Sequence, residues 1–297
     1  MGRGDFMSTP FTVSRALSVS GLVPFEAKLL LAHVLGRDRA WLAAHADEAV
    51  GAEQAKIFDA LARRRRDGEP VAYLTGTREF WGLSLLVTPN VLIPRPETET
   101  LVERALVRIP AERETHVLDL GTGSGAIALA LARERPRAKI VATDVSEAAL
   151  RVAEANARRL GVFNVEWVCA DWYAGLPLPL SRPAFAVIVS NPPYIAASDP
   201  HLGEGDVRFE PMLSLTPGGD GLSALATIVP GAMPRLAPNG WLLVEHGYDQ
   251  QNTVRALFEA AGFVDLESSR DLAGIPRVCA GRNPGVMAVA RRNVESS

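Results

Sequence analysis

The 297-residue chain is poor in cysteine and has no long apolar run, and both absences limit its class. Its two cysteines, Cys169 and Cys279, lie in apolar runs and form no Cys-x-x-Cys pair, so a disulfide framework is not indicated. No stretch approaches the roughly 18 uninterrupted apolar residues of a membrane-spanning helix. Residues 1–10 lack the apolar core of a signal peptide. We therefore expect a cytoplasmic protein without a membrane partner.

The chain also lacks an excess of charge of either sign. Its 31 Lys and Arg residues stand against 34 Asp and Glu residues, for a net charge of −3, whereas proteins that bind nucleic acid usually carry a basic excess. The only basic run in the sequence, Arg63 to Arg66, fits a solvated helix end better than a binding patch. We therefore expect no direct nucleic-acid partner. We also expect no metal site and a monomeric protein.

Residues 1–75 are predicted to form a small helical domain, because apolar residues recur there at helical spacing. One helix opens at Pro24 and closes before Gly36, and two more are expected over residues 40–45 and 53–66. This region contains no evident group of catalytic side chains. A role in docking a substrate is one interpretation of it.

Residues 76–98 are predicted to form a β-hairpin and a linker. Residues 79–83 and 85–87 suggest two short strands around Gly82. Pro94 and Pro96 then stiffen an extended segment, and a helix is expected to start at residue 97 or 98 and to continue through residue 106. Two interpretations of the stiff segment stay open, a rigid linker or a wall of the active site.

From residue 115 onward, strand patterns alternate with helix patterns. The expected strands are residues 116–120, 139–144, 165–171, 184–190, 241–245, 263–267 and 277–280, and the expected helices are residues 126–134, 146–160, 221–236 and 249–261. Repeated βαβ units predict a parallel sheet with helices on both faces. Residues 99–297 are therefore predicted to form an α/β domain with a mostly parallel, seven-stranded sheet. Ligands of such sheets bind beyond the carboxyl ends of the strands.

Three features follow successive strands at that edge. The first is the loop after residue 120, where Gly121, Gly123 and Gly125 alternate with Thr122 and Ser124. Glycines let a backbone approach a ligand closely, and the N-terminus of the following helix can bind a carboxylate or a phosphate. Because the loop also fits the dinucleotide pattern G-x-G-x-x-G/A, a nicotinamide cofactor has to be weighed.

The second and third features are acidic residues. Asp144 ends the next strand, where its carboxylate can accept hydrogen bonds from both ribose hydroxyls of an adenosine-bearing cofactor. Asp171 and Trp172 end the third strand. There the acid can accept from the exocyclic amine of an adenine, and the indole can pack on the ring. The alternative for this pair is a helix N-cap beside a core tryptophan.

The deciding feature is Asn191-Pro192-Pro193-Tyr194, which ends a run of apolar strand-forming residues. The prolines hold the backbone of this turn rigid. The Asn191 side-chain oxygen and the Pro192 carbonyl can accept both N–H bonds of a planar NH₂ group, and the Tyr194 ring can pack on that group. The nitrogen lone pair then faces a sulfonium methyl in line, so orientation and electrostatics supply the catalysis. Hydride transfer would leave the turn unexplained.

Together these motifs resemble the Rossmann-like S-adenosylmethionine-dependent methyltransferases that act on planar nitrogens. More narrowly, the chain resembles the peptide chain release factor N(5)-glutamine methyltransferase family from about residue 12 to residue 282. The supporting segments are residues 70–76, 79–82, 93–99, 191–194 and 205–211. Adenine-N6 DNA methyltransferases share the Asn-Pro-Pro-Tyr motif, so residues 93–99 and the helical domain carry the specific part of the resemblance.

The resemblance implies methylation of the glutamine in the Gly-Gly-Gln motif of class 1 release factors, with S-adenosyl-L-methionine as the cofactor. The implied cofactor contacts fall on residues 121–125, Asp144, Trp172 and Asn191, to which the residue-level reasoning adds Asp171. The implied glutamine contacts fall on residues 191–194, where Asn191, Pro192 and Tyr194 are the expected catalytic residues. The helical domain is implied to dock the factor.

Two alternatives keep the same transfer chemistry. A glutamine methyltransferase acting on a ribosomal protein differs only in its substrate, and residues 93–99 and 205–211 favour the release-factor branch. An adenine-N6 DNA methyltransferase needs a basic groove and a flipped base. The net charge of −3 and the acidic segment 199–210 argue against it.

Overall fold

The structure, a computed structural model, describes residues 11–176 and 184–285, so the outer ends of the predicted domains lie outside the described residues. It divides into an N-terminal unit, Met1–Gly76, and a C-terminal unit, Thr77–Ser297. Each unit has hydrophobic clusters of its own. Among the described residues, no helix is long and apolar enough to cross a membrane.

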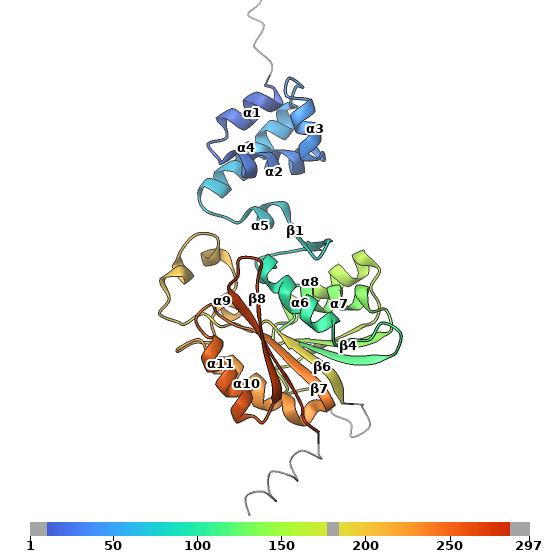
Figure 1. The fold of residues 1–297 in the computed structure, drawn as a ribbon. Helices are drawn as coiled ribbons and strands as arrows, with labels where there is room; N and C mark the ends of the chain where they lie inside the picture. Colours follow the sequence, from blue (N-terminus) through green and yellow to red (C-terminus); the bar gives the residue numbers. More distant parts are fainter. Residues whose placement is uncertain (1–10, 177–183, 286–297) are drawn as a thin grey trace, which may run out of the picture. The chain divides into compact units, whose positions relative to one another are not determined.

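The N-terminal unit is helical, as predicted. Its helices are α1 (Val13–Val19), α2 (Pro24–Leu35), α3 (Arg39–Ala44), α4 (Ala52–Arg66) and α5 (Val71–Thr75) (Figure 1). The predicted ends of α2 are confirmed, because Pro24 occupies its first turn and Gly36 ends it at φ 61° in the left-handed region. Leu30, Leu31 and Phe58 are buried at the centre of the unit.

The basic run at the end of α4 is only partly solvated. Arg63 and Arg64 are exposed, with side chains 68% and 53% accessible. The Arg65 side chain is 17% accessible and makes two hydrogen bonds, of 2.8 and 2.9 Å, to the carboxylate of Glu26 on α2. The expectation of a solvated helix end was therefore wrong for Arg65, which ties α4 to α2.

The C-terminal unit begins with an antiparallel hairpin of β1 (Thr77–Phe80) and β2 (Leu83–Leu86). The strands differ from the predicted residues 79–83 and 85–87 because Trp81 and Gly82 form the turn. Both have positive φ, 52° and 65°, as the tight turns of hairpins require. The hairpin then presents Phe80, Leu83 and Leu85 to the core.

Seven strands form the main sheet, and the predicted mostly parallel arrangement is confirmed. Its strands are β3 (Thr115–Leu120), β4 (Ala138–Asp144), β5 (Val165–Cys169), β6 (Phe185–Ser190), β7 (Leu236–Glu245), β8 (Val264–Arg270) and β9 (Pro276–Arg282). The order is β5-β4-β3-β6-β7-β9-β8, and β9 alone runs in the direction opposite to the other six strands. Strand β7 begins earlier than predicted because residues 237–240 are absorbed as an irregularity opposite β6.

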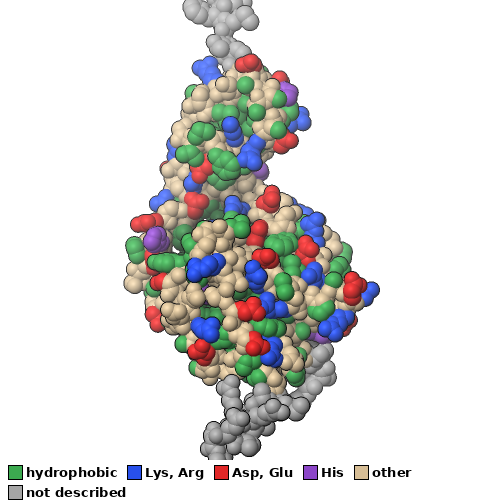
Figure 2. Space-filling view, viewed as in Figure 1, with side chains coloured by type: hydrophobic (Ala, Val, Ile, Leu, Met, Phe, Trp, Pro, Cys, Tyr) green, Lys and Arg blue, Asp and Glu red, His purple; other side chains and the backbone are tan. Residues whose placement is uncertain are grey.

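Helices cover both faces of the sheet (Figure 1). Helices α6 (Glu99–Leu106), α7 (Ala126–Glu134) and α8 (Glu147–Leu160) contribute to one core cluster, and α10 (Ser223–Ala232) and α11 (Gln251–Ala260) to the other. Alternate residues of the central strands supply the two clusters: Val187 and Val189 belong to the first, whereas Ile188 belongs to the second. Figure 2 shows acidic and basic side chains interspersed over the viewed face of this unit.

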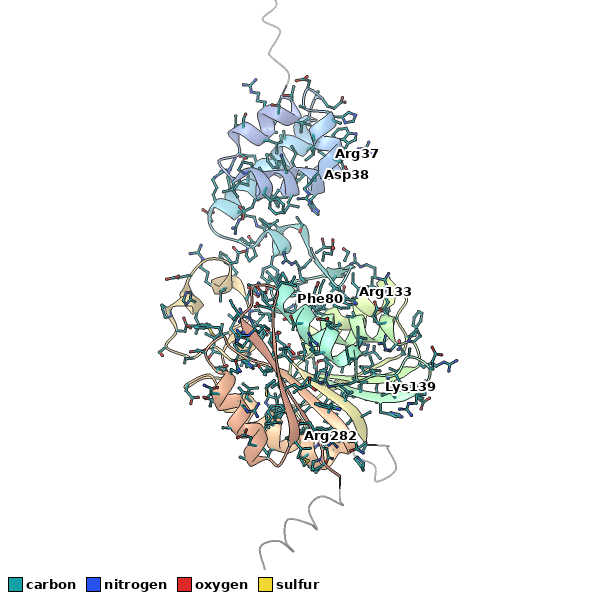
Figure 3. The ribbon with its side chains drawn as sticks, in the orientation of Figure 1. Arg37, Asp38, Phe80, Arg133, Lys139 and Arg282 are labelled. Atoms are coloured by element: carbon teal, nitrogen blue, oxygen red, sulfur yellow. The ribbon has the colours of Figure 1, made fainter. Side chains whose placement is uncertain are left out.

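The strand order places the chain reversal between β3 and β6. From β3 the sheet grows through β4 and β5 on one side, and through β6 and β7 on the other. Open α/β sheets bind ligands at such a switch point, beyond the carboxyl ends of the strands. In Figure 3, Lys139 lies near the start of β4 and Arg282 lies at the end of antiparallel β9. Both residues mark the end of the sheet where the parallel strands begin, opposite to their carboxyl ends.

Candidate active site

A cleft opens at the carboxyl edge of the sheet and holds about 630 Å³ of space, its open mouth included. Loops after four neighbouring strands supply most of its lining. The lining residues are Gly121, Gly123, Asp144, Val145, Ala170, Asp171, Trp172, Asn191 and Pro193, joined by Leu92, Leu213 and Ser214. The structure therefore brings together residues as far apart in the sequence as Leu92 and Ser214, which are separated by 122 positions (214 − 92).

The glycine loop after β3 reaches the cleft through Gly121 and Gly123. Thr122, Ser124 and Gly125 are buried and do not line it. Gly125 has φ 83°, and a Cβ there would lie 3.1 Å from both the Ala153 Cβ and the Leu129 Cδ1. This glycine is thus required for the close packing of the loop on α7 and α8.

Asp119, the last but one residue of β3, is buried beneath the same loop. Its Oδ2 accepts a hydrogen bond of 2.7 Å from the Thr122 hydroxyl. Burial raises the pKa of the Asp119 carboxyl to about 7, because a charged carboxylate loses its hydration inside the protein. Thr122 therefore fixes the loop from below and does not face the cleft.

Asp144 stands at the end of β4 and faces the glycine loop. Its Oδ2 accepts from the Gly123 N–H at 2.9 Å, and its Oδ1 accepts from the Ser146 N–H at 2.9 Å. Burial raises the pKa of this carboxyl, against the opposing effect of these backbone N–H groups. The Gly123 N–H is therefore engaged within the protein.

Asp171 and Trp172 follow β5 in a tight turn. Asp171 pairs with Ala174 through both backbone groups, at 3.2 and 2.8 Å, so the chain turns back and does not enter a helix. The helix N-cap alternative for Asp171 was therefore wrong. Trp172 has φ 49°, a costly conformation for a bulky residue, and its ring lies beside Gly121, where a Cβ would be 3.4 Å from the Trp172 Cζ3.

The Asn-Pro-Pro-Tyr turn is split between two cavities. Asn191 and Pro193 line the cleft, Pro192 is buried, and Tyr194 lines a second cavity. The Asn191 Nδ2 donates a hydrogen bond of 3.1 Å to the Thr98 Oγ1. The Asn191 side chain is therefore held by a residue from the stiff segment that precedes α6.

That stiff segment is a wall of the cleft and not only a linker. Leu92 lines the cleft on one side, and Leu213 from α9 (Met212–Leu215) lines it on another. The buried Glu210 connects the two segments, because its carboxylate accepts from the Ile93 N–H at 3.0 Å and pairs with Arg95. Residues 93–99 and 205–211, two of the segments that supported the narrow resemblance, thus hold each other in place.

Both units of the chain are similar to known protein families. Residues 13–76 match the PrmC N-terminal domain, and residues 98–204 match the methyltransferase small domain. A release factor glutamine methyltransferase from Burkholderia pseudomallei is 52% identical over 282 residues, covering 93% of this chain and 98% of that protein. Another from Bordetella pertussis is 51% identical over 265 residues, covering 89% and 97%.

The chain belongs to the release factor glutamine methyltransferase family. The resemblance inferred from the sequence motifs is thereby confirmed, as is the assignment to the methyltransferases. A methyltransferase from Pyrococcus furiosus shares the fold, with a TM-score of 0.50 and 18% identity, over 75% of this chain and 98% of that chain.

Gly221 and Gln250 support the Asn-Pro-Pro-Tyr turn, and neither residue was predicted from the sequence. A Cβ at Gly221 would lie 2.4 Å from the Tyr194 carbonyl oxygen, so this position, at φ 84°, accepts only glycine. The Gln250 side chain donates to the same carbonyl at 2.9 Å and accepts from the Gly247 N–H at 2.9 Å. The glycine-rich segment before α10 was the signal available in the sequence.

Glu245 is a buried carboxyl beside the Asn-Pro-Pro-Tyr turn. It ends β7, is 1% exposed, and accepts a hydrogen bond of 3.1 Å from the Tyr194 hydroxyl. Burial raises the pKa of the Glu245 carboxyl to about 7, while the hydrogen bond from Tyr194 and the charge of Arg277 act in the opposite direction. Burial, followed by the Glu245 charge, raises the pKa of Tyr194, so this phenol stays protonated and donates.

Proposed function

We propose that this protein methylates the side-chain amide nitrogen of the glutamine in the Gly-Gly-Gln motif of class 1 peptide chain release factors. The methyl donor is S-adenosyl-L-methionine. Membership of the release factor glutamine methyltransferase family supports the substrate, and the cleft supports the chemistry. The cleft combines an adenosine-type site with Asn191 and Pro193 of the rigid Asn-Pro-Pro-Tyr turn.

The cleft lining fits S-adenosyl-L-methionine. A carboxylate offers about four lone-pair positions, and two backbone N–H groups occupy only part of those on Asp144, which leaves acceptors for ribose hydroxyls. Asp171 and Trp172 stand at the next strand end with an acid and an aromatic face for the adenine. When bound, the cofactor supplies an electrophilic methyl group on a sulfonium.

The residues of the turn orient the glutamine amide. The Asn191 Oδ1 and the Pro192 carbonyl are proposed to accept its two N–H bonds, and Tyr194 to pack on its plane. An amide nitrogen is a poor nucleophile because its lone pair is delocalised, so holding it in line with the methyl group is the main contribution of the protein. Two prolines keep the backbone of this turn from adapting to other geometries.

One observation carries the proposal: Asn191 and Pro193 line the same cleft as Gly121, Asp144 and Trp172. The test is incubation with labelled S-adenosyl-L-methionine and, separately, a purified class 1 release factor, ribosomal proteins and duplex DNA, followed by mass mapping. We expect label on the glutamine of the Gly-Gly-Gln motif. A release factor with alanine in place of that glutamine is the matched control, and it should stay unlabelled. Label on ribosomal protein alone, or on adenine, would refute the proposed substrate.

We further propose that the N-terminal unit docks the release factor. The match to the PrmC N-terminal domain and the separate core of this unit support the proposal. A chain that lacks residues 1–76 should bind S-adenosyl-L-methionine as the full chain does, but its KM for the intact factor should rise. An unchanged KM for the factor would exclude a docking role.

A further inference from the structure

The peptide unit between Tyr194 and Ile195 directly follows the Asn-Pro-Pro-Tyr turn, and hydrogen bonds hold it at both of its polar groups. Its N–H, which belongs to Ile195, donates to the Leu215 carbonyl at 3.0 Å. Its carbonyl, which belongs to Tyr194, accepts from the Gln250 Nε2 at 2.9 Å. Because a peptide unit is planar, these two bonds fix the orientation of the whole unit.

The orientation of this unit matters because the turn has few backbone groups by which it can be held. Pro192 and Pro193 have no N–H to donate, and their φ angles are already fixed. Rotation of the peptide unit after Tyr194 would change the direction in which the chain leaves the turn. A displacement of about 1 Å in a catalytic group can slow a reaction by about 100-fold, so a fixed exit supports the rate of transfer.

Gln250 can hold the Tyr194 carbonyl because both ends of its amide have a backbone partner. Its Oε1 accepts from the Gly247 N–H at 2.9 Å, while its Nε2 donates to the Tyr194 carbonyl. A backbone N–H only donates and a carbonyl only accepts, so the amide fits these partners in one orientation. Gln250 directly precedes α11, and its own carbonyl accepts from the Val254 N–H at 2.9 Å. The side chain therefore extends from a fixed backbone.

The contact lies outside the hydrophobic core of the C-terminal unit. Gln250 is half-buried, and both it and Tyr194 line the second cavity. Gly221 packs against the same peptide unit, because a Cβ at this glycine would lie 3.1 Å from the Ile195 carbonyl carbon and closer still to the Tyr194 carbonyl oxygen. The unit thus cannot shift toward residue 221, and the Gln250 amide holds its carbonyl in place.

We propose that Gln250 is a positioning residue for methyl transfer, which fixes the peptide unit after Tyr194 and thereby the catalytic turn. The inference rests on the proposed transfer to a planar nitrogen held by that turn. Among the described residues, those that line the cofactor cleft do not include Gln250. Its replacement should therefore change kcat and not the binding of S-adenosyl-L-methionine.

The test compares two variants with side chains of similar size. Gln250→Met removes both hydrogen bonds, whereas Gln250→Glu keeps an acceptor for the Gly247 N–H and, as a carboxylate, loses the donor to the Tyr194 carbonyl. We expect kcat to fall by roughly tenfold in Gln250→Met, the effect of one net hydrogen bond, and by at least as much in Gln250→Glu, whose carboxylate repels the carbonyl. The dissociation constant of S-adenosyl-L-methionine should stay within about twofold of the wild-type value.

The Gln250→Glu variant separates positioning of the turn from a structural role in the loop of residues 247–250. If Gln250 served only to hold Gly247, Gln250→Glu would turn over like the wild type and Gln250→Met would not. The matched control is Thr253→Ala, at an exposed position that lines the same cavity, and its kcat should change by less than about twofold. Should Gln250→Met not fold, Gln250→Glu decides the question by itself, with cofactor binding as the check on folding.

Two results would overturn the inference: a kcat of Gln250→Glu within about twofold of the wild type, or a loss of cofactor binding that accounts for the whole loss of activity. The assay uses whichever substrate the wild-type enzyme methylates. A wild-type enzyme that modifies no planar nitrogen refutes the proposed function, whereas an active wild type with an equally active Gln250→Glu variant refutes only this inference.

Discussion

Asn156 tests how the glycine loop is supported, because one buried amide connects three backbone groups. The residue lies on α8 and is 0% exposed. Its Oδ1 accepts from the Leu86 N–H at 2.6 Å, and its Nδ2 donates to the carbonyls of Leu86 and Ser124 at 3.0 Å each. The hairpin strand β2 and the loop of the cleft are therefore fastened to the same side chain.

Asn156→Ala leaves these three backbone groups without a partner. Each unsatisfied buried group costs about 1–3 kcal/mol. Leu86 is half-buried, so water can reach part of its backbone and the lower end of that range applies. We expect the free energy of unfolding of the C-terminal unit to fall by about 3 kcal/mol, a large part of the stability of an ordinary domain.

Two further variants make the experiment specific. Asn156→Asp keeps the shape and the acceptor for the Leu86 N–H, but it directs a carboxylate oxygen at two carbonyls, so it should destabilise at least as much as Asn156→Ala. The control is Asn252→Ala, at an exposed position of α11, which should change stability by less than about 0.5 kcal/mol.

Urea unfolding followed by tryptophan fluorescence is the assay. Four of the five tryptophans lie in the C-terminal unit, namely Trp81, Trp167, Trp172 and Trp241. A loss below about 1 kcal/mol for Asn156→Ala, or an Asn156→Asp variant that is more stable than Asn156→Ala, would show that the three hydrogen bonds do not hold the loop.

Three other outcomes are expected. Asp144→Ala should raise the dissociation constant of S-adenosyl-L-methionine by at least about tenfold in calorimetry, the effect of losing one charge-assisted contact, and an unchanged constant would count against the ribose assignment. Glu210→Ala should lower the free energy of unfolding in urea by about 2 kcal/mol, because the buried Ile93 N–H loses its acceptor. A change below about 0.5 kcal/mol would show that Glu210 does not hold residues 93–99 in the wall of the cleft. The pKa of Asp119 is raised from 3.8 to about 7, so the folded protein binds this proton more tightly than the unfolded chain. Stability should thus decline as pH rises from 3.8 to about 7, and Asp119→Asn should flatten that decline. An identical slope would contradict the assignment.

Much of the C-terminal fold could be predicted from the sequence because its signals are local. Alternating strand and helix patterns gave the seven strands, and the parallel sheet follows from repeated βαβ units. The predicted strand bounds were wrong where a residue adopts a backbone conformation that is unusual for its type. Trp81 has positive φ in the hairpin turn, and residues 237–240, which include Pro238 and Asn239, stay within β7 as an irregularity opposite β6.

The cleft was predictable only where its residues follow strand ends. Gly121, Asp144, Asp171 and Asn191 could be placed because parallel strands end at one edge of a sheet. Their supporting partners could not, because these contacts join residues far apart in the chain. Thr98 meets Asn191 across 93 positions, and no spacing in the sequence announces such a pair.

The most direct test of the central claim is the rate of methyl transfer by Asn191→Ala at saturating S-adenosyl-L-methionine, measured on a release factor together with the cofactor dissociation constant. If Asn191 holds the glutamine nitrogen in line, transfer should slow by at least about 100-fold, as for the loss of one oriented polar group, while the cofactor dissociation constant changes little. Transfer at the wild-type rate would contradict the account.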